Sequence, residues 1–410
     1  MTDGRLLFVS TRFLFPIDSG GKIRTTQILR GLKGGSFQVT LVSPATEEAV
    51  ERHSGDLESV CDEFRWWPQP RRGRLFHYTR MRHLTSRLPI PVRTDRHEEG
   101  LSVVTKALQE SPDVAVFDFA HAAVLAPAAL ACPSVMFTHN VEAEIFRRHR
   151  DVAGNPLFRA IWSDQYRKMR AFEQSALERF DVVVAVAERD SAQFVADYGI
   201  RESFVIPTGV DLEFFAWRAP ERKRDVVFCG SMDWMANQEG VAFFMDEVWD
   251  RISKAVPDAA MTVVGRAPPA RMIDEARRRG LNWRFTGFVD DVRPFVQGSA
   301  VSVIPLRVGG GTRLKAYEAM AMGSPVVSTS IGMEGLPVVA GEHFLKADRP
   351  DELADAVVAL LGDDARRERL SRAARSFVEA NFSYEVAARA FETACRLAIE
   401  RRTGCGGRRA

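Results

Sequence analysis

Two basic residues and one acidic residue follow a run of three glycines in the second half of the chain. The segment VGGGTRLKAYEAMAMGSPVV (308–327) places Arg313, Lys315 and Glu318 directly after these glycines. The glycines are Gly309, Gly310 and Gly311. Glycine lets backbone amides approach a ligand closely, and the amide end of a following helix attracts anions. Because Lys and Arg oppose the helix dipole at this end, their presence there indicates that a phosphate joins them.

The residues after the glycines predict a helix that could hold the rest of a nucleotide. We expect it to begin near Thr312, a fair N-cap residue, and to end at Gly323. Leu314 lies in its first turn and Glu318 one turn later, where a carboxylate could accept hydrogen bonds from the vicinal hydroxyls of a ribose. A turn that leads into a core helix with a solvated charged face remains the alternative.

Familiar phosphate and metal motifs are absent from the sequence. Lys22 follows Gly20 and Gly21, but Pro16 stands where a P-loop has its first glycine and Ile23 where it has Ser or Thr. No two aspartates are separated by one residue, so a D-x-D metal clamp is missing. We therefore expect no required cofactor and no metal, with the anion held by amides and cations.

Short runs of Val, Ile and Phe alternate with helical segments in both halves of the chain. Such runs predict parallel strands buried on both faces, and hence an α/β fold with two doubly wound, Rossmann-like domains facing a cleft. The expected domains are an acceptor-side domain at 1–200, a donor-side domain at 201–375, and a returning C-terminal helix with a disordered Gly/Arg tail at 376–410. Ligands of such sheets bind outside the carboxyl ends of the strands.

Composition narrows the class of protein. A chain of 410 residues suits two domains, and a formal charge of +2 gives no reason to expect a nucleic-acid partner. The five cysteines form no C-x-x-C motif, which suits a reducing compartment. The N-terminus lacks the layout of a signal peptide, so we expect a cytoplasmic protein.

Polar residues also follow a predicted strand in the first half. The polar residues in FTHNVEAEIFRR (137–148) are His139, Asn140, Glu142 and Glu144. Polar groups at a strand exit suit the hydroxyls of an acceptor or a sugar. The alternative is an N-cap at Asn140 with a nearby Glu in a capping-box-like position.

Several segments together resemble one family. EAMAMGSPVV (318–327) resembles the donor-binding signature of family four of the retaining glycosyltransferases, which have a GT-B fold. Further segments resemble that family in the same order along the chain: IPTGVDLEFF (206–215), VFCGSMDWMANQEGVAFF (227–244), TVVGRAPP (262–269), FTGFVDDVRPF (285–295) and FSYEVAARAFE (382–392). The overall look is closest to sugar transferases of exopolysaccharide loci of the PEP-CTERM/EpsH type.

The resemblance implies an activity and its partners. It implies transfer of a sugar, with retention at the anomeric carbon, from a nucleotide-diphosphate sugar to a hydroxyl of a glycan or a lipid-linked glycan. Polysaccharide or glycoconjugate biosynthesis is the expected setting. Two alternatives stay open, a nucleotide-sugar epimerase of the same fold and a non-catalytic subunit that binds sugar nucleotides.

The resemblance also implies roles for single residues. We expect the catalytic group to consist of Arg313, Lys315, Glu318 and His121. The resemblance implies that His121 lies at the donor sugar; a core histidine is the alternative for His121. The expected donor-binding residues are Gly20, Gly21, Gly230, Ser231, Arg266, Val289, Gly309, Gly310, Gly311, Thr312 and Leu314. The expected acceptor-binding residues are Arg24, His139, Asn140 and Glu142. For Gly20 and Gly21, a turn that needs positive φ is the alternative.

The sequence departs from the family pattern at the donor site. The first of two family glutamates should stand at position 310, where this chain has Gly310. Ser231 stands at the place of a family arginine, and Asn237 and Gln238 lie near the place of a family lysine. Arg313 and Lys315 are therefore the expected replacements as cations for the diphosphate.

One segment has a strong bias in composition. Residues 65–97 contain nine Arg, three His and one acidic residue, together with aromatic side chains. A basic, aromatic face predicts contact with an anionic membrane surface or a phosphate-bearing acceptor, here at the inner face of the membrane. A solvated surface helix is the alternative.

Overall fold

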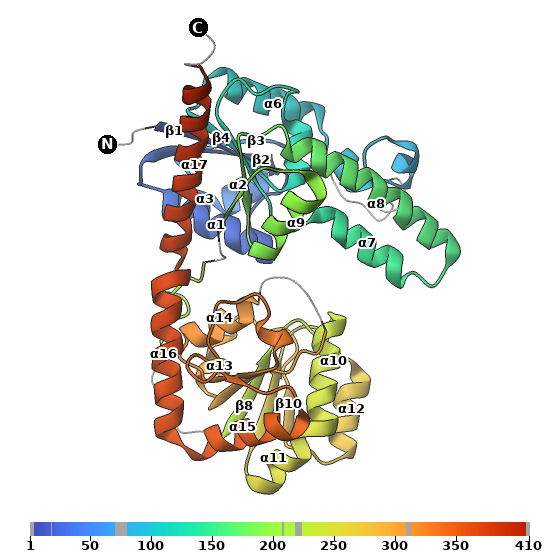
Figure 1. Cartoon of the computed structure of the whole chain (residues 1–410), viewed down its shortest axis with the longest axis vertical. Helices are drawn as coiled ribbons and strands as arrows, with labels where there is room; N and C mark the ends of the chain where they lie inside the picture. The colour runs from blue at the N-terminus through green and yellow to red at the C-terminus, as the bar shows by residue number, and fades with distance from the viewer. Residues whose placement is uncertain are drawn as a thin grey trace. The chain divides into compact units, whose positions relative to one another are not determined.

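The chain folds into two compact units, each with its own parallel sheet (Figure 1). The computed structural model describes residues 4–17, 19–69, 80–206, 209–217, 224–308 and 313–406. The first unit comprises Met1–Gly209 and Ala387–Ala410, and the second comprises Val210–Val386. The predicted α/β class with two doubly wound, Rossmann-like domains is confirmed. The domains expected from the sequence ended at residues 200 and 375.

Within the described residues, the first sheet has seven parallel strands in the order β3-β2-β1-β4-β5-β6-β7. They are β1 (Gly4–Ser10), β2 (Phe37–Ala45), β3 (Glu63–Pro68), β4 (Val114–Asp118), β5 (Ser134–Phe137), β6 (Val182–Ala185) and β7 (Ser203–Val205). The chain winds from β1 outward to β3 and then resumes on the other side of β1 at β4. Because the winding reverses between β1 and β4, the loops after these two strands border the position where such sheets bind ligands.

The first sheet is buried on both faces, as the continuous apolar runs predicted. Successive side chains of a strand point to opposite faces, so Leu6 and Phe8 of β1 join one core while Leu7 and Val9 join another. Helix α1 (Gly20–Leu32) covers the first face, and α6 (Glu98–Gln109) covers the second. The sheet is thus held rigidly between helices.

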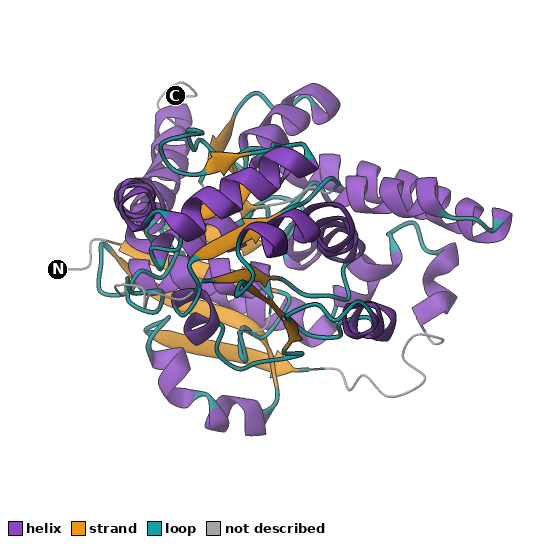
Figure 2. Cartoon of the chain, turned by 90° about the horizontal axis from the view of Figure 1, so that it is seen from below, coloured by secondary structure: helices purple, strands orange, loops and turns teal. Residues whose placement is uncertain are grey.

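Two helices of the first unit form a hairpin that stands out from the sheet. Helices α7 (Glu142–Val152) and α8 (Pro156–Leu177) pack along each other and extend sideways from the unit (Figure 1; Figure 2). The remaining helical elements of this unit are α2 (Glu47–Arg52), α3 (Ser54–Glu58), the 3-10 helix η1 (Met81–Thr85), α5 (Ile90–Asp95), the 3-10 helix η2 (Ala120–Leu125) and α9 (Glu188–Tyr198).

The last helix returns to the first unit. Helix α17 (Tyr384–Gly406) places Phe391 in the core of the first sheet, with ring centroids 6.4 Å from Phe8 and 5.0 Å from Phe137. The expected return of the C-terminal helix to the N-terminal domain is therefore observed. Residues 407–410 of the expected disordered tail lie outside the described residues.

Within the described residues, the second sheet has six parallel strands in the order β10-β9-β8-β11-β12-β13. They are β8 (Asp225–Cys229), β9 (Ala260–Val264), β10 (Trp283–Phe285), β11 (Val301–Ile304), β12 (Val326–Ser328) and β13 (Leu345–Lys346). The helical elements are α10 (Met235–Phe243), η3 (Phe244–Val248), α11 (Trp249–Ala255), α12 (Ala270–Arg278), α13 (Arg293–Gln297), α14 (Leu314–Ala321), η4 (Ile331–Met333), α15 (Pro350–Gly362) and α16 (Asp364–Phe382). Here the winding reverses between β8 and β11, so the residues after these strands border the corresponding position.

Candidate functional site

Lys315 reaches from α14 to the carboxyl end of β8. Its Nζ donates a hydrogen bond of 2.7 Å to Asn237 Oδ1 and lies 4.7 Å from the centre of the Phe228 ring. Gly230 leaves room for this ammonium group, because a β-carbon on Gly230 would lie 2.8 Å from Lys315 Nζ. The sequence expected Lys315 to replace a family lysine near Asn237, and the structure brings Lys315 and Asn237 into contact.

The surroundings of Lys315 lower the pKa of its ammonium group. Burial, together with the neighbouring charge of Arg313, lowers the pKa of Lys315 to about 8. An anion beside the ammonium group would restore the charged form.

Glu318 lies one turn after Lys315 on the wall of a small cavity. The cavity, of about 20 Å³, lies against the carboxyl-terminal parts of β8 and β11 and is also lined by Cys229 and Ile304. Burial raises the pKa of Glu318 to about 7, although the charge of Lys315 opposes the shift. No residue that the structure describes donates a hydrogen bond to this carboxyl, so its acceptor capacity is available to a ligand.

Ser231 and Arg266, both expected at the donor site, lie together. Arg266 follows β9, and its Nε donates to Ser231 Oγ at 2.8 Å and to Asp233 Oδ2 at 3.0 Å. The Arg266 side chain is 59% exposed, so part of the guanidinium remains accessible. Val289, also expected there, instead packs against the apolar core of the second unit.

The glycine segment itself is only partly described. Gly309, Gly310, Gly311 and Thr312 lie outside the described residues. Helix α14 begins at Leu314, with Arg313 at the N-cap position, two residues later than expected. The end of the helix is as expected, because Gly323 adopts a φ of +75° just after it.

Arg313 differs from Lys315 in its surroundings. It is 3% exposed, and its Nη2 donates a 2.9 Å hydrogen bond to the backbone carbonyl of Ile331 in η4. Burial lowers the pKa of Arg313, against the charge of Glu334. Arg313 thus contributes to holding η4 against α14, whereas Lys315 is the cation at the carboxyl end of the sheet.

Gly21 allows a close approach within the first unit. A β-carbon there would come within 2.6 Å of Phe119 Cζ. Neither Gly20 nor Gly21 has a positive φ angle, so the alternative of a turn that needs positive φ is wrong. Gly21 instead lets the start of α1 pack directly on Phe119, the residue that follows β4.

A buried polar network at the carboxyl edge of the first sheet includes two expected acceptor residues. Arg24 Nη1 donates to His139 Nδ1 at 2.9 Å, and His139 Nε2 donates to Asp118 Oδ1 at 2.7 Å. Arginine can only donate, so this arrangement fixes His139 as the neutral tautomer protonated on Nε2. Asp118 also accepts from the hydroxyls of Ser10 and Thr25.

The charges of this network follow from its burial. Burial lowers the pKa of Arg24 to about 10, although the charge of Asp118 opposes the shift. Burial also lowers the pKa of His139, again against Asp118. Sequence reasoning missed Asp118, although an ionisable residue at the end of the buried run VAVFD (114–118) is a signal that could have indicated it.

His121 lies apart from this network, between two carboxylates. Its Nδ1 lies 3.1 Å from Asp95 Oδ2, and its Nε2 lies 3.7 Å from Glu142 Oε2. The residue is 7% exposed, and its Nε2 has no hydrogen-bond partner among the described residues. Burial alone would lower the pKa of His121, but the Asp95 hydrogen bond and the charge of Glu142 outweigh it and raise this pKa. Asp95, on α5, was not predicted.

The start of α7 is capped from another helix. Val141 holds the N-cap position, and its side chain makes no cap hydrogen bond. The alternative of an Asn140 N-cap is therefore wrong, and Asn140 is exposed. The carboxylate of Glu173, on α8, accepts instead from the amides of Glu142 and Ala143. This leaves the side chain of Asn140 available at the surface.

The basic segment 65–97 does not form a single helix in its described part. Arg65 belongs to β3 and pairs with Glu63 and Glu110, while Trp67 is buried. The rest includes η1 and α5, and residues 70–79 lie outside the described residues. In the parts of the chain that are described, no helix is long and apolar enough to cross a membrane, and no group of three His, Cys, Asp or Glu side chains could hold a metal ion.

Comparison with known proteins identifies the family of the chain. Residues 19–214 match a family model described as Glycosyltransferase Family 4, and residues 223–363 match one described as Glycosyl transferases group 1. Together the two matches cover well over half of the chain. The chain belongs to the glycosyltransferases of the family 4 and group 1 type. The first match contains Arg24, Asp118 and His139, and the second contains Lys315 and Glu318.

Curated relatives of the chain are distant. One is an uncharacterized 44.6 kDa protein in the cps region of Klebsiella pneumoniae, 24% identical over 38% of this chain and 42% of that protein. A phosphatidyl-myo-inositol mannosyltransferase of Mycobacterium leprae is 29% identical over 40% of this chain and 46% of that protein. The lipopolysaccharide core mannosyltransferase LpsB of Rhizobium meliloti is 26% identical over 59% and 72%. The chain thus spans less than half the length of the first two relatives.

Solved structures share the fold over nearly the whole chain. Sucrose-phosphate synthase of Thermosynechococcus elongatus superposes with a TM-score of 0.68 and 16% identity, covering 96% of this chain and 98% of that one. Anabaena HepE in complex with UDP gives a TM-score of 0.67 and 14% identity, with coverage of 95% and 98%. At these identities the likeness shows the fold of the chain and nothing finer.

Proposed function

We propose that the chain transfers a sugar from a nucleotide-diphosphate sugar to a hydroxyl of a glycan or lipid-linked acceptor. The observation that carries the proposal is Lys315, a cation of lowered pKa at the carboxyl end of β8, one helical turn from the open carboxyl of Glu318. Family membership supports sugar transfer, and the solved neighbour HepE binds UDP.

The proposed chemistry follows from the charges at this site. Departure of a nucleoside diphosphate builds negative charge, which cations positioned in advance stabilise most effectively. Lys315 and the accessible part of Arg266 supply that charge, and Glu318 accepts hydrogen bonds from the ribose hydroxyls. In this scheme, neither a dedicated metal nor another cofactor is needed to balance the negative charge of the diphosphate.

The finer features of the function are proposed from the family pattern. They are retention at the anomeric carbon, a hexose as the transferred sugar, a role in polysaccharide or exopolysaccharide biosynthesis, and a cytoplasmic location. The relatives that act in lipopolysaccharide core and phosphatidylinositol mannoside synthesis support a glycan or lipid-linked acceptor.

A ligand screen tests the proposed donor. In thermal-shift measurements with UDP-, GDP-, ADP- and TDP-sugars, one nucleotide should raise the melting temperature, because binding to the folded state alone stabilises it. At a concentration of about 100 times Kd, the stabilisation is about 2.7 kcal/mol. Turnover that requires an added acceptor identifies a transferase, turnover of the donor alone favours the epimerase, and binding without turnover favours a non-catalytic subunit. No shift with any of the four would contradict the proposal.

Asp95→Asn tests whether Asp95 orients His121 and keeps it protonated. Because an amide removes the charge facing Nδ1, the pKa of His121 should fall, and the charged imidazole should be lost at lower pH than in the wild type. Glu142 and Arg12, the other charged groups that act on His121, remain in place. A pH titration of the histidine rings by NMR measures the change, and the pH profile of sugar transfer should move in the same direction.

Asp151→Asn, at the exposed end of α7, is the matched control and should leave the His121 titration unchanged. An unchanged midpoint in Asp95→Asn would show that the Asp95 contact does not hold the proton on His121.

A further inference from the structure

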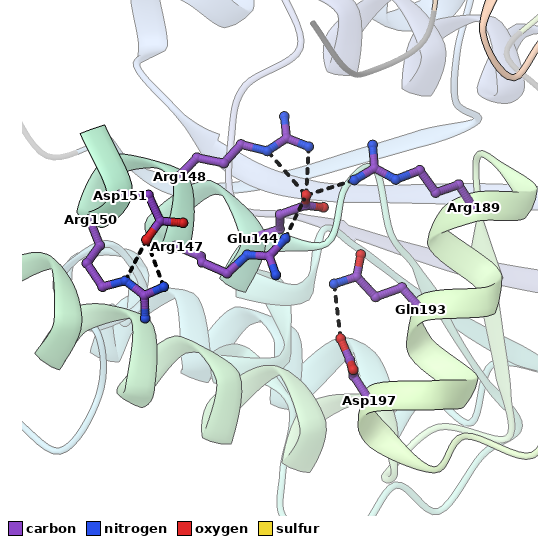
Figure 3. Close-up of polar contacts among 8 residues, drawn as sticks. All are labelled: Glu144, Arg147, Arg148, Arg150, Asp151, Arg189, Gln193 and Asp197. Carbon is purple, nitrogen blue, oxygen red and sulfur yellow. Dashed lines mark hydrogen bonds and ion pairs between the residues drawn. The ribbon is translucent and has the colours of Figure 1, made fainter. Parts of the chain in front are cut away.

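Three arginine side chains converge on one carboxylate in the first unit (Figure 3). Glu144 Oε1 accepts hydrogen bonds from Arg147 Nη2 at 3.2 Å, Arg148 Nη2 at 2.8 Å and Arg189 Nη2 at 2.7 Å. Glu144, Arg147 and Arg148 lie on α7, whereas Arg189 comes from α9. We call Arg147, Arg148 and Arg189 the arginine cluster.

The arginine cluster carries more positive charge than its protein partners balance. One carboxylate faces three guanidinium groups, and burial of Glu144 is outweighed by these groups, which lower its pKa and keep it ionised. Asp190 is a further acidic residue on which the charges of Arg189 and Arg148 act, and it accepts no hydrogen bond from the described residues. Even with Asp190 counted, three positive charges meet two negative ones.

The guanidinium groups also retain unused donors. The side chains of Arg147, Arg148 and Arg189 are 46%, 52% and 55% exposed, whereas that of Glu144 is 9% exposed. A guanidinium has five N–H donors, and in this cluster the described contacts use only those directed at one carboxylate oxygen. Glu144 thus gathers three guanidinium groups while most of their donors still face solvent.

Stability alone does not account for this arrangement. The Glu144–Arg148 pair, four residues apart on α7, would already give the small gain of a surface ion pair. Arg189 is the second residue of α9, where the helix dipole disfavours a cation. Adding Arg147 and Arg189 brings like charges together, and an anion with two or more negative charges would remove that cost.

The position of the cluster connects it with the expected acceptor residues. Helix α7 follows β5 and carries Glu142 at its first position, and α9 follows β6. The charge of Asp190 acts on both Arg189 and the buried Arg24. The arginine cluster therefore lies on two helices that follow strands at the carboxyl edge of the first sheet, the edge that also carries the Arg24–His139 network.

We propose that the arginine cluster binds a phosphate group of the acceptor, so that the acceptor is a phosphorylated compound. This inference rests on the proposed function for the existence of an acceptor, but its binding chemistry is separate from the donor site. Planar guanidinium groups match phosphate oxygens in pairs. The same phosphate chemistry could belong to a soluble sugar phosphate or to a lipid-linked phosphate.

Binding of inorganic phosphate to the full chain tests the subsite directly. Isothermal titration should show that the double variant Arg148→Ala/Arg189→Ala binds phosphate at least about tenfold more weakly than the wild type. Arg150→Ala is the matched control, because Arg150 lies on the same helix but pairs with Asp151 outside the cluster (Figure 3). Phosphate bound elsewhere contributes equally in all three proteins. Circular dichroism checks folding, and Arg189→Gln carries the test if the double variant unfolds.

A second measurement separates the two sources of phosphate. Co-sedimentation with phosphatidylcholine vesicles, with and without phosphatidic acid, should depend on the cluster if the phosphate is lipid-borne. Loss of vesicle binding in the double variant supports a lipid-linked acceptor, and phosphate binding without vesicle binding supports a soluble one. Equal phosphate binding in the wild type and the double variant, or none in either, overturns the subsite. Because no donor is present, failure of the proposed function would leave this result unaffected.

Discussion

Replacement of Lys315 with methionine is expected to weaken binding of the nucleotide-diphosphate donor by at least about tenfold, equivalent to about 1.4 kcal/mol. Methionine keeps the unbranched side chain over the Phe228 ring and removes only the charge and the hydrogen bond to Asn237. The loss should fall on interactions with the diphosphate, because the ammonium group lies at the carboxyl end of β8, the position at which a doubly wound sheet presents its ligand.

The pH dependence of binding gives a sharper test of Lys315. Since burial lowers its pKa to about 8, the free site loses its positive charge as pH rises through that value, and donor affinity should fall with it. In Lys315→Met the affinity should be low and should lack this dependence. Lys254→Met, at an exposed position of α11, is the control for loss of a lysine in the same unit. Donor affinity equal to that of the wild type in Lys315→Met would exclude Lys315 from the donor site.

The architecture could be predicted from the sequence because each sheet repeats one local signal many times. The run VAVFD (114–118) is apolar at nearly every position, and only a strand covered on both faces needs that pattern. The rule that ligands bind at the carboxyl ends of strands favoured His139, and the family resemblance favoured Gly230. Both lie at that edge in the structure, Gly230 beside Lys315 and His139 beside Arg24.

The partners of these residues could not be predicted, because they come from distant parts of the chain. Gly21 is required by the ring of Phe119, not by its own φ angle. Asp95 contacts His121 from a short helix inside segment 65–97, whose sequence was marked by its basic and aromatic residues. Glu173, on α8, accepts a hydrogen bond from the first turn of α7, where the sequence pattern had favoured a local cap by Asn140. Local patterns specify elements, whereas contacts between elements decide the site.

Replacement of Glu318 with glutamine is expected to make the protein more stable at pH 8. The folded-state pKa of about 7 lies above the ordinary value of 4.5 because the carboxyl is buried. The folded state therefore binds more protons than the unfolded state between these values, and stability falls as pH rises through about 7. At pH 8 the ionised carboxylate bears the full cost of burial, so glutamine should stabilise the protein by on the order of 1–3 kcal/mol. The attraction to Lys315 is already contained in this pKa.

Two comparisons check the stability of Glu318→Gln. Urea unfolding at pH 8 should show the gain, and at pH 5 it should largely disappear, because the carboxyl of the folded protein is then neutral as well. Glu342→Gln, at an exposed carboxylate, should change stability little at either pH.

The same substitution is expected to weaken donor binding by about tenfold or more, because hydrogen bonds to a charged acceptor contribute about 1.5–3 kcal/mol. A variant with higher stability and lower donor affinity indicates a carboxylate that serves ligand binding and lowers the stability of the protein. The opposite pair of results, lower stability with unchanged donor affinity, would identify Glu318 as a structural residue of α14. Measuring unfolding and nucleotide binding on one preparation decides between these roles. A carboxylate that is buried without a hydrogen-bond donor lowers stability, so its retention is explained only if a ligand uses it.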